Sequence, residues 1–284
     1  MAQIQTGGRP SKVARDESVL AGLVRDGMTI GIGGFGLDRK PMALVRAIVR
    51  SGVRGLTIET YAGGFDIEAL LAADAVRCIS SCHVGLDQFG LAPLFRAARE
   101  AGRIVYEEWS ELSQLHAWRA AADGAAFAAV PMDKSSGLLK VNPALQLAAS
   151  PFGGEKVVVA RAPRIDLAIL HAEAAHPEGW AVAAGDPYLD AILARAAGKV
   201  ILSAERLMDD AELEARHRDV HLLASYVDAI VVAPHGALPG SCLPAYMIDL
   251  PPIRAYVEAG GEATAAGRVA AVLAHTPDLR PASR

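Results

Sequence analysis

With 284 residues, the chain is long enough for one large or two small domains with a well-filled core. Its composition, 52% hydrophobic and 21% charged, is ordinary for an α/β protein that folds in water. The formal net charge of −4 provides no basic surface for nucleic acid, and no apolar run reaches about 18 residues without a charge or a turn. Nucleic-acid binding and a membrane span are therefore excluded.

Cysteine usage and the start of the chain bear on the cellular compartment. Cys78, Cys82 and Cys242 are too few and too scattered for a disulfide framework, which is typical of a reducing compartment. Residues 1–15 are polar and lack the apolar core of a signal peptide. We therefore expect a cytoplasmic protein.

Strand-like and helix-like runs alternate along most of the chain, which predicts an α/β fold with a mostly parallel, open sheet flanked by helices. In chain order, the predicted elements are a strand at Thr29–Ile32, a helix at Pro41–Arg50, a strand at Leu56–Tyr61, a helix at Ile67–Ala72, a strand at Val76–Ser80, a helix at Ala92–Ala101, a strand at Arg103–Glu107, a long helix continuing through Ala122, strands at Val157–Ala160 and Leu167–His171, a helix at Asp186–Ala197, and strands at Val200–Ser203 and Ala229–Ala233. Residues 131–151 are rich in turn signals and are expected to leave the sheet. We expect one domain over residues 1–284, with peripheral tails at 1–15 and 261–284.

The turn after the first predicted strand is the most informative segment. Gly33 and Gly34 permit positive φ and remove the side chains that would keep a ligand away. Pro41 suits the first turn of the helix that follows. Because open α/β sheets bind ligands at the carboxyl ends of their parallel strands, this turn is the first candidate site.

This segment resembles the α subunits of class I CoA-transferases, whose pattern is an Asp-Gly pair, an apolar strand, Gly-Gly-Phe and a proline. The matching residues are Asp26, Gly27, Gly33, Gly34, Phe35 and Pro41. Two positions depart from the pattern: Gly31 lies inside the apolar strand, and Arg39 replaces a common glycine. The Asp-Arg-Lys-Pro run resembles the glutaconate CoA-transferase A-subunit branch. The likeness continues in residues 166–172, 177–179, 227–231 and 233–237.

The resemblance implies a three-layer fold shared by both subunits of a heteromeric enzyme. In that family a glutamate attacks the acyl-CoA thioester, and a mixed anhydride and a glutamyl-CoA thioester follow. The nucleophile normally lies in the β subunit, in a Ser-Glu-Asn-Gly context that this chain lacks. The chain is therefore expected to need a β subunit, in a heterodimer or a heterotetramer. Acyl-CoA would be its substrate, and no permanently bound cofactor is expected.

The turn and the residues after it are the expected binding groups. Gly33, Gly34 and Phe35 are interpreted as backbone N–H donors to a thioester oxygen or to the pantetheine arm of CoA. A tight turn that needs glycine would explain the same residues without a ligand. Arg39 and Lys40 are expected to meet a carboxylate or a CoA phosphate. A solvated helix start explains this pair equally well.

Glu108 and Glu111 are the candidate catalytic carboxylates. If a helix starts here, they lie one turn apart on the same face. This segment and the run Arg39–Ile48 resemble a second two-subunit branch, the hydrolases that open the last ring of steroid-derived CoA thioesters with an essential glutamate of the A subunit. The resemblance implies that Glu111 acts on water or a ring carbonyl as a base or nucleophile. An acidic first turn favoured by the helix dipole is the structural alternative.

The remaining cysteines and histidines carry weaker signals. Cys78 and Cys82 are interpreted as packing residues, because adjacency of Cys82 and His83 is no evidence that their side chains converge. His83 is kept as a candidate substrate contact at the end of a strand. No metal site is expected, since His171 and His176 lack a recognisable third ligand.

Three functions stay open at this point. The first is the α subunit of a CoA-transferase acting on an acyl-CoA and a carboxylic acid, dicarboxylic acids included. The second is the A subunit of a ring-opening hydrolase in which Glu111 is catalytic. The third is a ligand-binding regulatory module that lost catalysis. The intact Gly-Gly-Phe turn and the lack of a basic face argue against the third.

Overall fold

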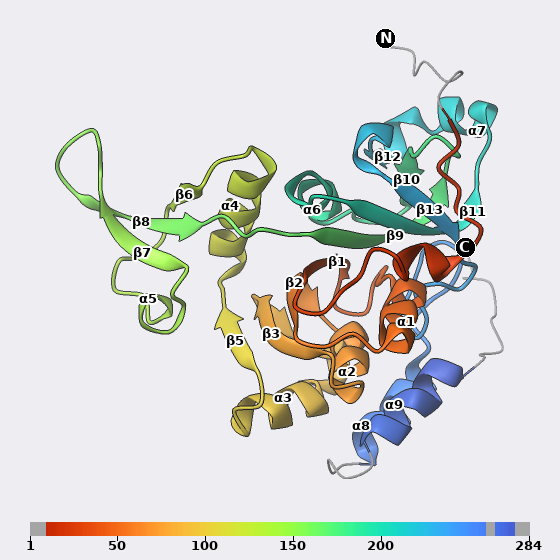
Figure 1. The fold of residues 1–284 in the computed structure, drawn as a ribbon, viewed down its shortest axis with the longest axis horizontal. Helices are drawn as coiled ribbons and strands as arrows, with labels where there is room; N and C mark the ends of the chain where they lie inside the picture. Colours follow the sequence, from red (N-terminus) through yellow and green to blue (C-terminus); the bar gives the residue numbers. More distant parts are fainter. Residues whose placement is uncertain (1–9, 260–264, 276–284) are drawn as a thin grey trace.

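The computed structural model describes residues 10–259 and 265–275 (Figure 1). Its centre is a parallel sheet, and each strand in the following order pairs with the next. The strands are β13 (Ala229–Val232), β11 (Val200–Leu207), β9 (Leu167–Ala175), β1 (Thr29–Phe35), β2 (Leu56–Gly63), β3 (Val76–Ser81) and β5 (Val105–Glu108). The predicted α/β class with a mostly parallel sheet is confirmed.

Three short strands complete this sheet, and none of them was predicted from the sequence. They are β4 (His83–Val84), parallel to β2, and the antiparallel strands β10 (Ala181–Val182) and β12 (Val220–Leu222). Runs of two or three residues are too short to show an alternating pattern, which is why the sequence did not reveal them.

Helices cover both faces of the sheet, so the fold has three layers (Figure 1). One face carries α1 (Met42–Ser51), α2 (Phe65–Ala72), α3 (Pro93–Glu100), α8 (Leu250–Glu258) and α9 (Ala265–Ala274). The other face carries α4 (Glu111–Ala122) and α6 (Asp190–Ala196). Each interface is filled by fully buried apolar side chains, for example Ile58 and Leu70 on the first face and Trp118 and Leu193 on the second.

Parts of both expected tails pack on this body. The Ala14 N–H donates to the Ile230 carbonyl (2.7 Å), which places the chain before β1 along β13. At the other end, α9 buries Val269 and Val272 against the neighbouring helices. The rest of the two tails, residues 1–9, 261–264 and 276–284, lies outside the described residues.

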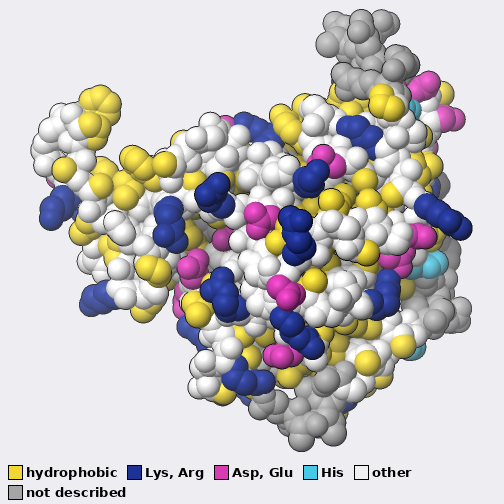
Figure 2. All heavy atoms as spheres, viewed as in Figure 1, with side chains coloured by type: hydrophobic (Ala, Val, Ile, Leu, Met, Phe, Trp, Pro, Cys, Tyr) yellow, Lys and Arg dark blue, Asp and Glu magenta, His cyan; other side chains and the backbone are white. Residues whose placement is uncertain are grey.

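The turn-rich middle of the chain forms an arm that stands away from the body (Figures 1 and 2). It consists of an antiparallel sheet and one short helix: β6 (Phe127–Val130), α5 (Leu138–Val141), β7 (Leu145–Ala149) and β8 (Lys156–Arg161). Phe152, between β7 and β8, is 97% exposed. The expected departure from the main sheet is therefore present, and it carries strands that the sequence analysis missed.

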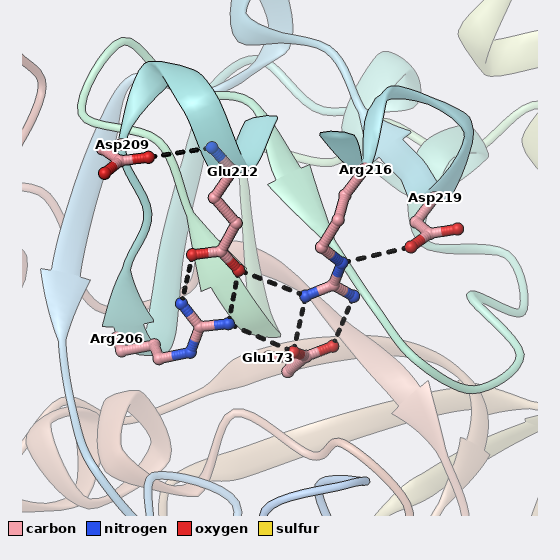
Figure 3. Close-up of polar contacts among 6 residues, drawn as sticks. All are labelled: Glu173, Arg206, Asp209, Glu212, Arg216 and Asp219. Atoms are coloured by element: carbon pink, nitrogen blue, oxygen red, sulfur yellow. Dashed lines mark hydrogen bonds and ion pairs between the residues drawn. The ribbon is translucent and has the colours of Figure 1, made fainter. Parts of the chain in front are cut away.

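An ion-pair network anchors the helix after β11, α7 (Asp210–Ala215), as Figure 3 shows. Glu173, on β9, accepts two hydrogen bonds from Arg216 (2.7 and 2.8 Å). Arg206, on β11, donates two to Glu212 (2.7 and 2.6 Å). These bidentate contacts tie the carboxyl half of β9 and β11 to α7.

The chain runs in opposite directions across the sheet on the two sides of β1. It proceeds through β2, β3 and β5 on one side, and through β9, β11 and β13 on the other. The strand order therefore reverses between β1 and β9, and such a switch point is where open α/β sheets form a ligand crevice. The Gly33-Gly34-Phe35 turn lies at the carboxyl end of β1, beside this point.

Close backbone packing beside the turn gives a first prediction, for Gly64→Ala. A Cβ on Gly64 would lie 2.0 Å from the Gly36 carbonyl oxygen, so a methyl group forces the two loops apart. We expect a loss of about 1–3 kcal/mol in the free energy of unfolding, measured by urea denaturation. Gly137→Ala is the matched control, because a Cβ there meets nothing within 4 Å. Equal stability of the two variants would contradict the packing argument.

Candidate functional site

The conformation of the Gly33-Gly34 turn requires glycine for structural reasons. Gly34 has a φ of +72°, and a Cβ there would approach the Asp38 carbonyl oxygen to 2.5 Å. A Cβ on Gly33 would meet the side chains of Leu170 and Asp190 at 2.4 and 2.6 Å. The tight turn thus accounts for both glycines before any ligand is considered.

The backbone donors of the turn bind groups within the chain. The Gly34 N–H donates to Asp190 Oδ1 (2.9 Å), and the Phe35 N–H donates to the Asp38 carbonyl (3.0 Å). Binding of a thioester oxygen through Gly33, Gly34 and Phe35 stays a prediction, and it would compete with these bonds. What the turn does present outward is the half-exposed ring of Phe35.

Arg39 is buried behind the turn rather than exposed at its surface. It adopts a φ of +48°, its side chain is 1% exposed, and Nη1 lies 2.9 Å from Asp190 Oδ2. Further donors reach the carbonyls of His171 (3.1 Å) and Asp186 (2.8 Å). Burial lowers the pKa of Arg39, but the Asp190 carboxylate outweighs it and the net pKa is raised.

Lys40 is buried on the other side of the same loop. Its Nζ donates to Thr60 Oγ1 (3.0 Å) and lies 3.4 Å from Asp66 Oδ2. Burial lowers the pKa of Lys40, although Asp66 favours the charged form. Both cations precede α1, which begins at Met42, so neither opens the helix as a solvated residue. Contact of Arg39 or Lys40 with a ligand stays a prediction and would require these internal bonds to change.

Three aromatic rings border the turn. Phe35 stacks on Tyr188 (centroids 5.0 Å apart, planes at 19°) and lies 6.0 Å from Tyr61. Tyr61 in turn contacts the buried Trp118 on α4 at 6.3 Å. Phe35, Tyr61 and Tyr188 are each partly exposed, and we call these three residues the aromatic edge. The edge joins the carboxyl ends of β1 and β2 to the loop before α6.

Glu111 lies next to this edge as the first residue of α4. Its side chain is exposed, and its charge contributes to raising the pKa of Tyr61 to about 12, after the larger effect of burial. Burial, followed by Glu111, likewise raises the pKa of Cys82 to about 12. The Cys82 thiol donates to the Tyr61 carbonyl (2.8 Å). A protonated, hydrogen-bonded thiol is no nucleophile, which supports the packing role assigned to Cys82.

Glu108 and Glu111 do not share a helix face, which corrects that expectation. Glu108 ends β5 and forms an ion pair with Arg99 (2.8 Å), whereas α4 begins at Glu111 behind the N-cap Ser110. The strand-to-helix turn at Trp109 and Ser110 therefore separates the two carboxylates. A catalytic role for either residue stays a prediction, but Glu111 is the one that borders the aromatic edge. His83, also predicted as a contact, is exposed at the start of β4.

Sequence reasoning missed Asp190 and the tyrosines of the aromatic edge. The predicted helix Asp186–Ala197 begins at Asp190, and Asp186 lies in the preceding turn, where its side chain accepts from the Tyr188 N–H (2.7 Å). Asp190 therefore faces the turn from the first residue of α6. The available signal was the Asp-Pro-Tyr run followed by a second aspartate at the start of an apolar helix.

A buried carboxyl group, Glu59, was also missed. It lies on β2 under α4, is 5% exposed, and accepts a hydrogen bond from Trp118 Nε1 (3.0 Å). Burial raises the pKa of Glu59 to about 7, although hydrogen bonds from Trp118 and Ser80 oppose the shift. It borders a cavity of about 400 Å³ near the amino ends of β1 and β2. The sequence signal was a glutamate inside an otherwise uncharged strand.

One side-chain group among the described residues could hold a metal ion. His171, Glu205 and Cys242 offer ligand atoms that lie within 4.8 Å of one another. Here they already bond to protein: His171 contacts Ser203 Oγ and Glu205 Oε1, both at 2.8 Å. Glu205 also accepts from the N–H groups of His235 and Gly236 and from Tyr246. The cluster thus forms a hydrogen-bonded network without an ion.

Fold and turn together define a parallel α/β protein whose candidate site is an open edge at the carboxyl ends of β1 and β2. The coenzyme A transferase family pattern matches residues 16–233, so the chain belongs to the coenzyme A transferase family. It is 32% identical over 87% of its length to the A subunit of glutaconate CoA-transferase from Acidaminococcus fermentans, covering 82% of that protein. It is 36% identical to the IpdA subunit of the cholesterol ring-cleaving hydrolase of Mycobacterium tuberculosis, with 87% of each chain covered.

Solved structures agree with this assignment. The crystal structure of glutaconate coenzyme A-transferase from Acidaminococcus fermentans superimposes with a TM-score of 0.81 at 32% identity, over 87% of this chain and 84% of that chain. A variant of the decarboxylase AibA/AibB gives a TM-score of 0.83 at 28% identity, over 93% and 100%. The chain is thus an A-type member of this enzyme family. No helix in the described ranges has the length and apolar character needed to cross a bilayer.

The buried Arg39–Asp190 pair gives a prediction for Arg39→Leu. Removing the guanidinium leaves Asp190 buried without its counter-charge, so we expect a loss of about 3–5 kcal/mol in the free energy of unfolding. Arg50→Leu is the control, because its ion pair with Glu17 is exposed and should contribute at most about 1 kcal/mol. Urea denaturation measures both. A normal stability for Arg39→Leu would show that Asp190 does not depend on Arg39.

Glu59 should make the stability of the fold pH-dependent. Its folded pKa of about 7 exceeds the ordinary value of 4.5, so the folded state binds more protons between these values. The free energy of unfolding should therefore fall as the pH rises from about 4.5 to about 7 and change little beyond. Glu59→Gln should remove this contribution, on the order of 3 kcal/mol, while keeping an acceptor for Trp118. The exposed Glu214→Gln is the control, and an unchanged slope in Glu59→Gln would refute the assignment.

Proposed function

We propose that this chain is the A subunit of a heteromeric enzyme that moves CoA between an acyl-CoA and a carboxylic acid. The single observation that carries the proposal is the Gly-Gly-Phe turn at the carboxyl end of β1, beside an open aromatic edge. The relatives named above are A subunits of two-subunit enzymes, which supports a B subunit of the same family as partner. All three cysteines are free, which supports a cytoplasmic location.

In this proposal the B subunit supplies the nucleophilic glutamate. Its carboxylate forms a bond to the acyl carbon, the carbon–sulfur bond breaks, and CoA leaves as the thiolate. The thiolate then attacks the glutamyl carbonyl of the mixed anhydride, which releases the first acid as its carboxylate. Attack by the second acid's carboxylate on the glutamyl thioester, followed by return of the thiolate, completes the exchange. The present chain contributes the surface against which the ester lies during these steps.

The residues of this chain would bind and orient rather than form the covalent bond. The aromatic edge would contact the acyl-pantetheine portion, and the buried Arg39–Asp190 pair would hold the turn in place. Cys82 stays protonated because its pKa is raised, so the thiol does not compete with CoA as a nucleophile. The half-exposed rings also exclude water from the ester, which limits hydrolysis.

A second function is favoured by one observation, the position of Glu111. This carboxylate is exposed at the start of α4 and interacts electrostatically with Tyr61 and Cys82 at the aromatic edge. From there it could activate water toward a CoA ester or a carbonyl of its acyl group. The alternative is therefore the A subunit of a hydrolase that opens a ring in a steroid-derived CoA thioester. A regulatory module is disfavoured, because the chain belongs to an enzyme family.

One experiment distinguishes the two enzymes. The chain is co-expressed with its B subunit, and the complex is incubated with acyl-CoA esters with and without a carboxylic acid acceptor. A transferase forms a new CoA ester only when the acceptor is present. Consumption of the ester without an acceptor would instead establish a hydrolase, and no turnover of any ester would refute both.

The variant Glu111→Gln separates the roles of the carboxylates. If the B-subunit glutamate is the nucleophile, as we propose, the variant complex should keep most of its acceptor-dependent transfer. If Glu111 is the base of a hydrolase, acceptor-independent turnover should fall by about 10²–10⁴-fold. Glu100→Gln, on the exposed face of α3, is the matched control. Loss of transfer in Glu111→Gln but not in Glu100→Gln would contradict the proposed division of labour.

A further inference from the structure

The groups exposed at the candidate site are aromatic and acidic. The aromatic edge consists of the half-exposed rings of Phe35, Tyr61 and Tyr188. The carboxylates beside it are Asp38, which accepts from Tyr188 (3.1 Å), and Glu111. A ligand that approaches this edge therefore meets ring faces and negative charge.

The two cations of the turn are not available to this surface. Arg39 and Lys40 are each 1% exposed, and their charges are directed to Asp190 (2.9 Å) and Asp66 (3.4 Å). Turning either cation toward a ligand would leave an aspartate buried without its counter-charge, which is strongly unfavourable. Among the cations that the sequence placed at this turn, none remains for the far carboxylate of a dicarboxylic acid.

We propose that the acyl group of the substrate is uncharged and apolar at its far end, with an alicyclic or aromatic body that lies on the aromatic edge. The inference rests on the proposed function and narrows its substrate class. An apolar body gains contact area on ring faces, which also favour offset or edge-on stacking. A terminal carboxylate would instead be held near Asp38 and Glu111, where like charges repel it.

The occupant follows from the position of the edge. The rings lie at the carboxyl ends of β1 and β2, beside the switch point where parallel α/β sheets bind ligands. The turn that carries Phe35 is also the segment through which the sequence resembles its family. A small-molecule ligand therefore fits this surface better than a purely structural contact, and burial of the rings by the B subunit is the rival outcome.

The test uses the assembled complex and two pairs of esters. Cyclohexylacetyl-CoA and hexanoyl-CoA have apolar acyl groups, whereas adipyl-CoA and glutaryl-CoA end in a carboxylate. Binding is measured by calorimetry and turnover by kcat/KM. We expect the apolar esters to be favoured by at least about tenfold, which corresponds to about 1.4 kcal/mol. Equal or better binding and turnover of the carboxylate esters would overturn the inference.

Variants of the edge connect the preference to these residues. Tyr61→Ser and Tyr188→Ser should raise KM for cyclohexylacetyl-CoA by about tenfold, which corresponds to about 1.4 kcal/mol, with little change for adipyl-CoA. Tyr61→Phe and Tyr188→Phe keep the rings and should restore the preference. Phe152→Ser, which removes a ring exposed at the tip of the arm, is the control. Unchanged selectivity in both serine variants would mean that the rings contact the B subunit instead.

The outcomes also separate this inference from the proposed function. If no ester is turned over but the apolar esters still bind more tightly, the proposed function is wrong and the inference about the ligand stands. If esters are exchanged but dicarboxylic ones are preferred, the function stands and the inference is wrong.

Discussion

The buried ion pair between Arg39 and Asp190 is the interaction on which the arrangement of the site depends. It joins the loop after β1 to α6, while Arg39 also bonds to the His171 carbonyl on β9 and Asp190 to the Gly34 N–H. These contacts close the switch point between the two halves of the sheet. Burying two charges is costly, and it is tolerated here because the carboxylate and most guanidinium donors have partners. The candidate ligand surface is consequently displaced outward, onto the aromatic edge.

The central sheet could be predicted because its strands are buried on both faces. Runs such as Leu167–His171 and Val200–Ser203 are continuously apolar, which is typical of parallel strands under helices. The arm could not be predicted in the same way. Its strands β6 and β7 are short and half-exposed, and their pairing with β8 is set by contacts far along the chain. For the same reason α8 and α9, which fill gaps on one face, left no clear signal.

The candidate site was predictable in position but not in detail. Its location followed from the glycine turn, and the exposure of His83 and Glu111 agrees with candidate contact residues. Arg39 and Lys40 were interpreted as ligand groups because two cations follow a turn. Their burial depends on Asp190, which lies 151 residues away from Arg39 in the sequence, and on Asp66. Pairings of this kind are properties of the fold, and residue type and spacing do not encode them.

The same burial explains how one fold can serve different acyl groups. Since the turn is held by an internal ion pair, the residues around it can change without loss of the backbone geometry at β1. The chemistry of the surface then depends on the few side chains that emerge there, here three rings and the carboxylates Asp38 and Glu111. With the covalent step assigned to a partner, selection of the substrate becomes the task left to this surface, and the burial of Arg39 and Lys40 at the turn sets which substrates it can select.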